Sequence, residues 1–170
     1  MDMPATIQGS ATARDFDALI GPHIEPGYRL AVTILGDPAE ARDAVQEAAI
    51  KAWRSLSRLR APDQARAWFL SIVANQCRST MRRHWWSFGR HPLPAVTAET
   101  REEATAQSID IAAGMARLDP SDRAILQLHY YLDLPLEEVA RVLGISPGAA
   151  RSRLYRAARR LRPNLIEEAH

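Results

Sequence analysis

Cysteine is nearly absent from this chain, and glycine and aromatic residues are sparse. Cys77 is the only cysteine among 170 residues, so no intramolecular disulfide can form, which fits a reducing cytoplasm. Free cysteine is usually buried and Cys77 lies in an apolar helical pattern, so we expect it to be a core residue rather than a nucleophile. The eight glycines form no glycine-rich phosphate loop, which leaves nucleotide-dependent catalysis without a motif.

Long apolar runs are missing as well. No run approaches the roughly 20 residues of a membrane span, and the N-terminus has no basic region followed by the apolar run of a secretory signal. His129 has no second histidine, cysteine or suitably spaced carboxylate beside it, so we expect it to pack rather than to bind a metal. These absences predict a cytoplasmic protein that is not an enzyme, holds no cofactor or metal and does not insert into a membrane.

The spacing of the apolar residues indicates an all-α protein, because we find helical periodicity and no strand pattern. We expect two small helical domains joined by a flexible linker, the second domain being a helix-turn-helix. The first domain spans 1–86 and the second 109–170. The linker, 87–108, contains Pro92 and Pro94, a tract of threonine, alanine and glutamate, and little apolar periodicity.

Four helices are expected in the first domain. One short helix precedes Pro22 and another follows Pro26, because proline disrupts a helix interior. A third begins after Asp37, where an aspartate N-cap, a proline at the first position and a glutamate at the third form a start signal, and it runs to about residue 57. The fourth covers about 63–84, after a basic loop.

The most explicit signal is the segment 135–161, which predicts two helices joined by a tight turn. The first helix ends at Gly144, as helices often do. Ser146 is a good N-cap and Pro147 suits a first helical position, so a second helix begins there. From Pro147 to Arg162 the chain has six arginines and no acidic residue. This pattern is typical of a helix-turn-helix that reads the major groove of DNA; a merely solvated arginine face would leave the turn chemistry unexplained.

Two polar faces in the first domain are explained by neither capping nor packing. Asp43 and Glu47 lie one turn apart beside the apolar stripe of their helix. In the next helix, a polar face that includes Asn75 has Trp68 at its margin. Aromatic residues beside arginines can stack on unpaired bases, and the alternative is that they are core residues. The same two alternatives apply to Trp85 and Trp86.

Three segments carry a resemblance to a known family. They are DPAEARDAVQEAAIKAWRSL at 37–56, RAWFLSIVANQCRSTMRR at 66–83 and LDPSDRAILQLHYYLDLPLEEVARVLGISPGAARSRLYRAARRL at 118–161. In this order they resemble bacterial RNA polymerase sigma factors of the sigma-70 family, above all the small, two-domain extracytoplasmic-function (ECF) group. The resemblance extends from about Asp15 to Leu161.

The resemblance implies a subunit that directs transcription initiation, with core RNA polymerase, promoter DNA and an anti-sigma factor as partners. Its first domain would dock on a coiled coil of the largest polymerase subunit and capture the −10 promoter element; its second would read the −35 element. The polymerase-binding residues would be Asp43, Gln46 and Glu47. The −10 contacts would be Arg58, Arg60, Trp68, Ser71, Asn75, Arg78 and Arg82. The −35 contacts would be Ser146, Gly148, Ala149, Arg151, Ser152, Arg153, Arg156 and Arg160.

One position of the recognition helix departs from the family pattern. The family often has threonine where this chain has Ala149, so a hydroxyl that could contact phosphate or a base is missing. Two other functions remain as alternatives. A sigma mimic that binds an anti-sigma factor would not need six arginines in its last helix, and a stand-alone helix-turn-helix regulator would leave the acidic helix without a purpose.

Overall fold

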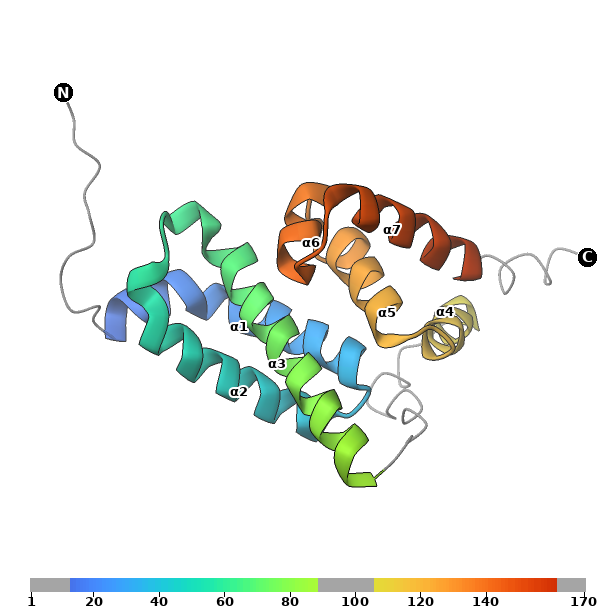
Figure 1. The fold of residues 1–170 in the computed structure, drawn as a ribbon, viewed down its shortest axis with the longest axis horizontal. Helices are drawn as coiled ribbons and strands as arrows, with labels where there is room; N and C mark the ends of the chain where they lie inside the picture. Colours follow the sequence, from blue (N-terminus) through green and yellow to red (C-terminus); the bar gives the residue numbers. More distant parts are fainter. Residues whose placement is uncertain (1–12, 89–105, 162–170) are drawn as a thin grey trace, which may run out of the picture.

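The computed structural model describes residues 13–88 and 106–161. Within these ranges the chain forms helices and turns and no strand, which confirms the all-α prediction. Helices α1 to α3 lie together in one group and α4 to α7 in a second, and the two groups pack against each other (Figure 1). The elements are α1 Ala13–Leu35, α2 Pro38–Ser55, η1 Leu56–Arg58, η2 Pro62–Gln64, α3 Ala65–Phe88, α4 Ala106–Ala116, α5 Pro120–Leu126, the π-helical η4 Gln127–Tyr131, α6 Leu136–Leu143 and α7 Pro147–Leu161.

Helix α1 runs without interruption through Pro22 and Pro26, so the break expected there is wrong. Each proline costs the helix one backbone hydrogen bond, because it has no N–H to donate. Tertiary packing outweighs this cost: α1 lies against both α2 and α3, and residues such as Ile20 are fully buried. Gly27 makes the close approach possible, since a Cβ at this position would lie 2.9 Å from Cε1 of Phe69 in α3.

The start of α2 follows the local sequence signal. Gly36 adopts a left-handed conformation with φ 73°, which lets the chain leave α1 and turn. The carboxylate of Asp37 then accepts a hydrogen bond from the backbone N–H of Glu40 at 2.9 Å, with Pro38 in the first helical position. The helix ends at Ser55 and a short 3₁₀ turn follows, close to the predicted end.

Helices α3 and α4 reach into the segment expected to be a linker. Helix α3 continues to Phe88 and α4 begins at Ala106, whereas the prediction placed the linker at 87–108. The rest of that segment, 89–105, lies outside the described residues, as do the side chains of Trp85 and Trp86. The domain boundary therefore stays a prediction.

The helix-turn-helix of the second domain is confirmed. Helix α6 ends at Gly144, whose φ of 66° places it in the left-handed region that favours glycine. The hydroxyl of Ser146 accepts a hydrogen bond from the N–H of Ala149 at 3.2 Å and so caps α7. Ala150 and Ala157 are fully buried and fix the side of α7 that faces the core.

Candidate nucleic-acid interface

Helix α7 presents most of its predicted contact residues to solvent. Because Ala150 and Ala157 face the core, the arginines on the opposite side point outward. Arg153 is half-buried, whereas Arg151 is exposed, so Arg151 is the better placed of this pair to reach a base edge. The exposed members of the predicted −35 set are Ser146, Gly148, Ala149, Arg151, Ser152, Arg156 and Arg160.

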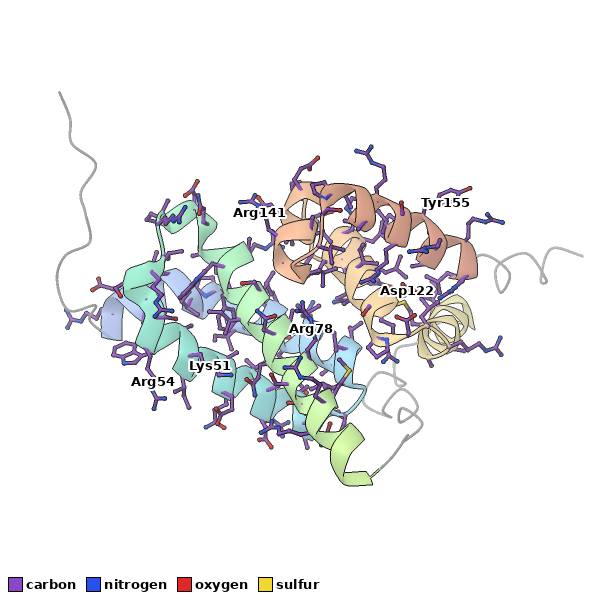
Figure 2. All side chains as sticks on the ribbon, in the orientation of Figure 1. Lys51, Arg54, Arg78, Asp122, Arg141 and Tyr155 are labelled. Carbon is purple, nitrogen blue, oxygen red and sulfur yellow. The ribbon has the colours of Figure 1, made fainter. Side chains whose placement is uncertain are left out.

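Tyr155 is a surface residue of α7 that the sequence reasoning missed. Its side chain is 64% exposed and projects away from the domain (Figure 2). It lies one turn after Arg151, and Cζ of Arg159 is 5.7 Å from the centre of its ring. A phenol ring among exposed arginines can contact a thymine methyl group or a phosphate. The sequence did carry a signal for Tyr155, because it is an aromatic residue that lies off the apolar stripe of a basic helix.

Arg160 already has a protein partner. Its Nη1 lies 2.7 Å from Oδ2 of Asp122 and 3.7 Å from Oδ2 of Asp119, so the end of α7 is tied to the start of α5. Asp122 is buried, and this burial together with the neighbouring carboxylate of Asp119 raises its pKa above the usual value, against the opposing effect of Arg160. Arg160 is therefore less available to a phosphate than the other exposed arginines of α7.

On the polar face of α3, side chains three positions apart are joined by hydrogen bonds. Nη1 of Arg78 donates to Oδ1 of Asn75 at 2.7 Å, and Nη2 of Arg82 donates to the hydroxyl of Ser79 at 3.0 Å. Asn75 and Arg82 are exposed, while Ser71 on the same face is half-buried. The face thus offers amide, hydroxyl and guanidinium groups in fixed positions.

The rest of the predicted −10 set flanks this face. Trp68 is half-buried and packs against the hydrophobic core, which favours the packing role over a freely exposed stacking platform. Arg58, the last residue of η1, and Arg60 are exposed in the segment before α3, on either side of Leu59, which is buried and anchors the segment. Two cations are therefore presented close to the N-terminal end of α3.

Arg78 also reaches across to the second domain. Its Nη2 donates to the carbonyl oxygen of Leu143, the last residue of α6, at 3.0 Å. Burial lowers the pKa of Arg78, and the positive charges of Arg82 and Arg153 lower it further. Because Arg153 belongs to α7, basic residues from both predicted DNA-binding faces influence the same guanidinium.

The outer face of α2 carries the predicted polymerase-binding residues. Asp43, Gln46 and Glu47 are all exposed, opposite the buried alanines of the helix. The same face continues into two apolar residues that the sequence reasoning missed: Ile50 is 39% exposed and Trp53 is 44% exposed. Trp53 is held in place by Phe16 of α1, in an edge contact with 5.4 Å between ring centres. The sequence did carry a signal for Ile50 and Trp53, because both are apolar residues that lie off the buried stripe of α2.

Neither a metal-binding cluster nor a membrane-crossing helix is found among the described residues. No group of three or more histidine, cysteine, aspartate or glutamate side chains in 13–88 and 106–161 could hold a metal ion. In the same part of the chain, no helix has the length and apolar character needed to cross a membrane.

In a comparison with known proteins, each half of the chain matches a family model. The family model of sigma-70 region 2 matches residues 19–87, and that of sigma-70 region 4 matches residues 108–161. The chain is 30% identical over 171 residues to the ECF RNA polymerase sigma factor SigL of Mycobacterium tuberculosis, covering 96% of this chain and 97% of that protein. It is 28% identical over 155 residues to the RNA polymerase sigma factor SigV of Bacillus subtilis, covering 88% and 90%.

Solved structures with the same fold include two complexes. The sigma factor RpoE, in complex with the anti-sigma factor NepR from Bartonella quintana, matches with a TM-score of 0.79 and 21% identity, over 93% of this chain and 100% of that one. CnrH, in complex with the cytosolic domain of CnrY, matches with a TM-score of 0.69 and 25% identity, over 94% and 93%.

Region 2 followed by region 4, in an all-helical chain with a basic helix-turn-helix at its end, defines a sigma factor of the sigma-70 class. Within that class the chain belongs to the extracytoplasmic-function group of RNA polymerase sigma factors. The family resemblance seen in the sequence is thereby confirmed.

Proposed function

We propose that this chain is a promoter-specificity subunit that binds core RNA polymerase and directs transcription initiation at promoters with defined −35 and −10 elements. The observation that carries the proposal is the basic, solvent-facing helix α7 in a chain of which 96% aligns with an ECF sigma factor. The protein acts by recognition rather than by catalysis. It works where the polymerase and the chromosome are, in the cytoplasm.

The −35 element is assigned to α7. N-terminal residues of a recognition helix meet base edges in the major groove, and Arg151 and Ser152 are exposed near that end. An arginine bidentate to guanine contributes about 1–3 kcal/mol of discrimination. Arg156, a turn further along, is placed to neutralise a phosphate, which strengthens binding to every sequence equally.

The −10 element is assigned to α3 and the loop before it. Asn75 offers an amide that can hydrogen-bond a base, and Arg82 offers a cation on the same exposed face. Arg58 and Arg60 extend this basic surface toward the N-terminal end of α3. Such a surface suits an unpaired strand, whose bases and phosphates are both accessible.

Binding of core polymerase is assigned to the outer face of α2. The carboxylates of Asp43 and Glu47 suit a basic partner, and Ile50 and Trp53 add an apolar surface that a partner can bury. Partly exposed tryptophans are frequent among the residues that dominate binding energies. An anti-sigma factor is a further expected partner, a proposal supported by the solved complex of the same fold that contains the anti-sigma factor NepR.

The proposal is tested by initiation with purified core polymerase on a library of genomic fragments, with the 5′ ends of the transcripts mapped. We expect the chain to produce start sites that share two sequence elements, and Arg151→Ala to redistribute them. Arg29→Ala is the matched control, because Arg29 is exposed on α1 and pairs with Glu25 of its own helix. Start sites identical to those of core polymerase alone would contradict the function.

A further inference from the structure

Asp122 lies at the start of α5, beside the last turns of α7 (Figure 2). Its Oδ2 accepts a hydrogen bond from Nη1 of Arg160 at 2.7 Å. The same nitrogen atom lies 3.7 Å from Oδ2 of Asp119, the N-cap of α5, whose Oδ1 accepts from the backbone N–H of Asp122 at 3.1 Å. Two carboxylates held by the first turn of α5 therefore meet one guanidinium at the end of the recognition helix.

The position of Asp122 is not explained by the start of α5. An acidic side chain in the first turn of a helix usually lies in solvent, where it interacts with the positive end of the helix dipole. The side chain of Asp122 is only 9% exposed and contacts another helix. Burial of a carboxylate costs free energy unless a cation and hydrogen bonds compensate for it. Capping thus explains Asp119, whereas the burial of Asp122 is linked to α7.

The contact with Asp122 gives α7 a second fixed point. The N-terminal end of the helix is fixed by its cap at Ser146, whereas Leu161 at the other end is only half-buried. The helix has 15 residues, about 22 Å at roughly 1.5 Å per residue, and Arg160 ties down its far end. Arg151 lies between the two fixed points. Base readout by a guanidinium requires placement within about 0.5 Å and 10–20°, which a helix held at both ends provides better than one that can tilt.

The carboxylate also influences the charge of the DNA-reading surface. Burial and the neighbouring charge of Asp119 raise the pKa of Asp122, whereas the positive charges of Arg160, Arg153 and Arg156 act to lower it. The attraction is mutual, so Asp122 lowers the positive potential around these three arginines. Because Asp122 is buried, water and salt screen this effect less than they would screen an exposed pair.

We propose that Asp122 is a positioning residue for reading of the −35 element: it fixes the end of α7 through Arg160 and weakens the attraction of that end for phosphates. The inference rests on the proposed function, since it concerns how α7 reads DNA. A phosphate contact strengthens binding to every sequence, whereas the base contacts assigned to Arg151 and Ser152 do not. Specificity is a difference between affinities, so a helix with weaker phosphate contacts and a fixed base-reading end discriminates better between sequences.

The test uses holoenzyme formed from core polymerase and the full-length chain. The probes are the strongest promoter found among the genomic fragments and the same fragment with its −35 element scrambled. Asp122→Asn removes the charge and keeps an oxygen that can accept from Arg160, and Arg160→Gln removes the contact from the other side. The controls are Asp133→Asn, an exposed acid of the same domain, and Arg156→Gln, an exposed cation of the same helix.

The two variants should lose discrimination in different ways. Asp122→Asn should bind the scrambled promoter about threefold more tightly and steepen the slope of log K against log salt concentration by up to about 0.9, the value for one further phosphate contact. Arg160→Gln should weaken binding to the intact promoter alone, by about fivefold, because its cation is already neutralised by carboxylates. Arg156→Gln should weaken binding to both promoters equally, and Asp133→Asn should match the wild type.

Variants of wild-type helicity decide between the outcomes. A purely structural role of Asp122 would weaken binding to both promoters in proportion, and that result would overturn the proposal. If Asp122→Asn fails to fold, Arg160→Gln decides the matter, because its side chain is 58% exposed. Wild-type holoenzyme without any preference for the intact promoter would contradict the proposed function itself. A wild-type preference that neither variant changes would contradict this inference alone.

Discussion

Nη1 of Arg160 lies 2.7 Å from Oδ2 of Asp122, so the last turn of the recognition helix is bound to the first turn of α5. The side chain of Asp122 is 9% exposed and that of Arg160 is 58% exposed. One partner is thus buried and the other faces solvent. This contact divides the arginines of α7 into those that are free to meet DNA and one that also supports the fold.

The first prediction compares Arg160→Ala with Arg156→Ala. Loss of Arg160 leaves the buried carboxylate of Asp122 without its cation, so the free energy of unfolding should fall by about 1 kcal/mol at neutral pH. Arg156 is exposed, and its loss should change stability by less than about 0.5 kcal/mol. DNA binding should show the opposite order. Arg156→Ala should reduce the dependence of DNA affinity on salt concentration more than Arg160→Ala does. Urea denaturation and anisotropy at several salt concentrations measure the two effects; equal stabilities would contradict the structural role.

The second prediction concerns the pH dependence of stability. The pKa of Asp122 is raised in the folded state, so its contribution is fully present below the ordinary value of 3.8 and is lost as pH rises through the folded-state pKa. Asp122→Asn removes this titration and keeps an oxygen that can accept from Arg160. The variant should therefore gain stability relative to wild type as pH increases above 3.8. Urea midpoints between pH 4 and 7 measure this, with the exposed Asp133→Asn as control.

The third prediction tests the docking face of α2. The double reversal Asp43→Lys and Glu47→Lys should weaken binding to core polymerase by at least about tenfold, because both charges face a basic partner in the proposed complex. The matched control is Asp17→Lys with Glu25→Lys, two exposed acids on α1. Titration of labelled protein with core enzyme gives the affinities. Equal weakening by both pairs would show a nonspecific charge effect rather than a docking site.

The fourth prediction tests the −10 face. Asn75→Ala and Arg82→Ala should reduce strand opening more than initial promoter binding, since unpaired bases are available only after the duplex opens. Permanganate reactivity of thymines reports opening, and a mobility assay reports binding. Arg83→Ala is the control, because Arg83 points to another side of α3, where it donates to Thr80. Wild-type reactivity in the first two variants would count against this face.

The fifth prediction concerns the single cysteine. Cys77 is fully buried in α3, and burial raises the pKa of its thiol to about 12. Since the thiolate is the reactive form, a thiol reagent at pH 8 should modify the native protein far more slowly than the protein in urea. The time course of labelling, read by mass spectrometry, measures the ratio. Fast labelling of the native chain would mean that this part of the core opens readily.

Local signals in the sequence were sufficient for most of the fold. The N-cap at Asp37, the turn at Gly144 and the cap at Ser146 all act within a few residues, so they can be read without knowing the neighbours in space. The basic character of α7 was equally visible. The uninterrupted helix through Pro22 and Pro26 was not, because the burial that outweighs two missing hydrogen bonds comes from other helices.

Contacts between distant segments needed the packed structure. Arg123 and Ile34 are 89 positions apart, and Arg78 and Leu143 are 65 apart, so no local pattern marks them as partners. An arginine in sequence is equally compatible with DNA, an ion pair or a helix end. Which of these it meets depends on how the helices pack, and that is why Arg160 and Arg78, both assigned to DNA from the sequence, are found bound to protein groups.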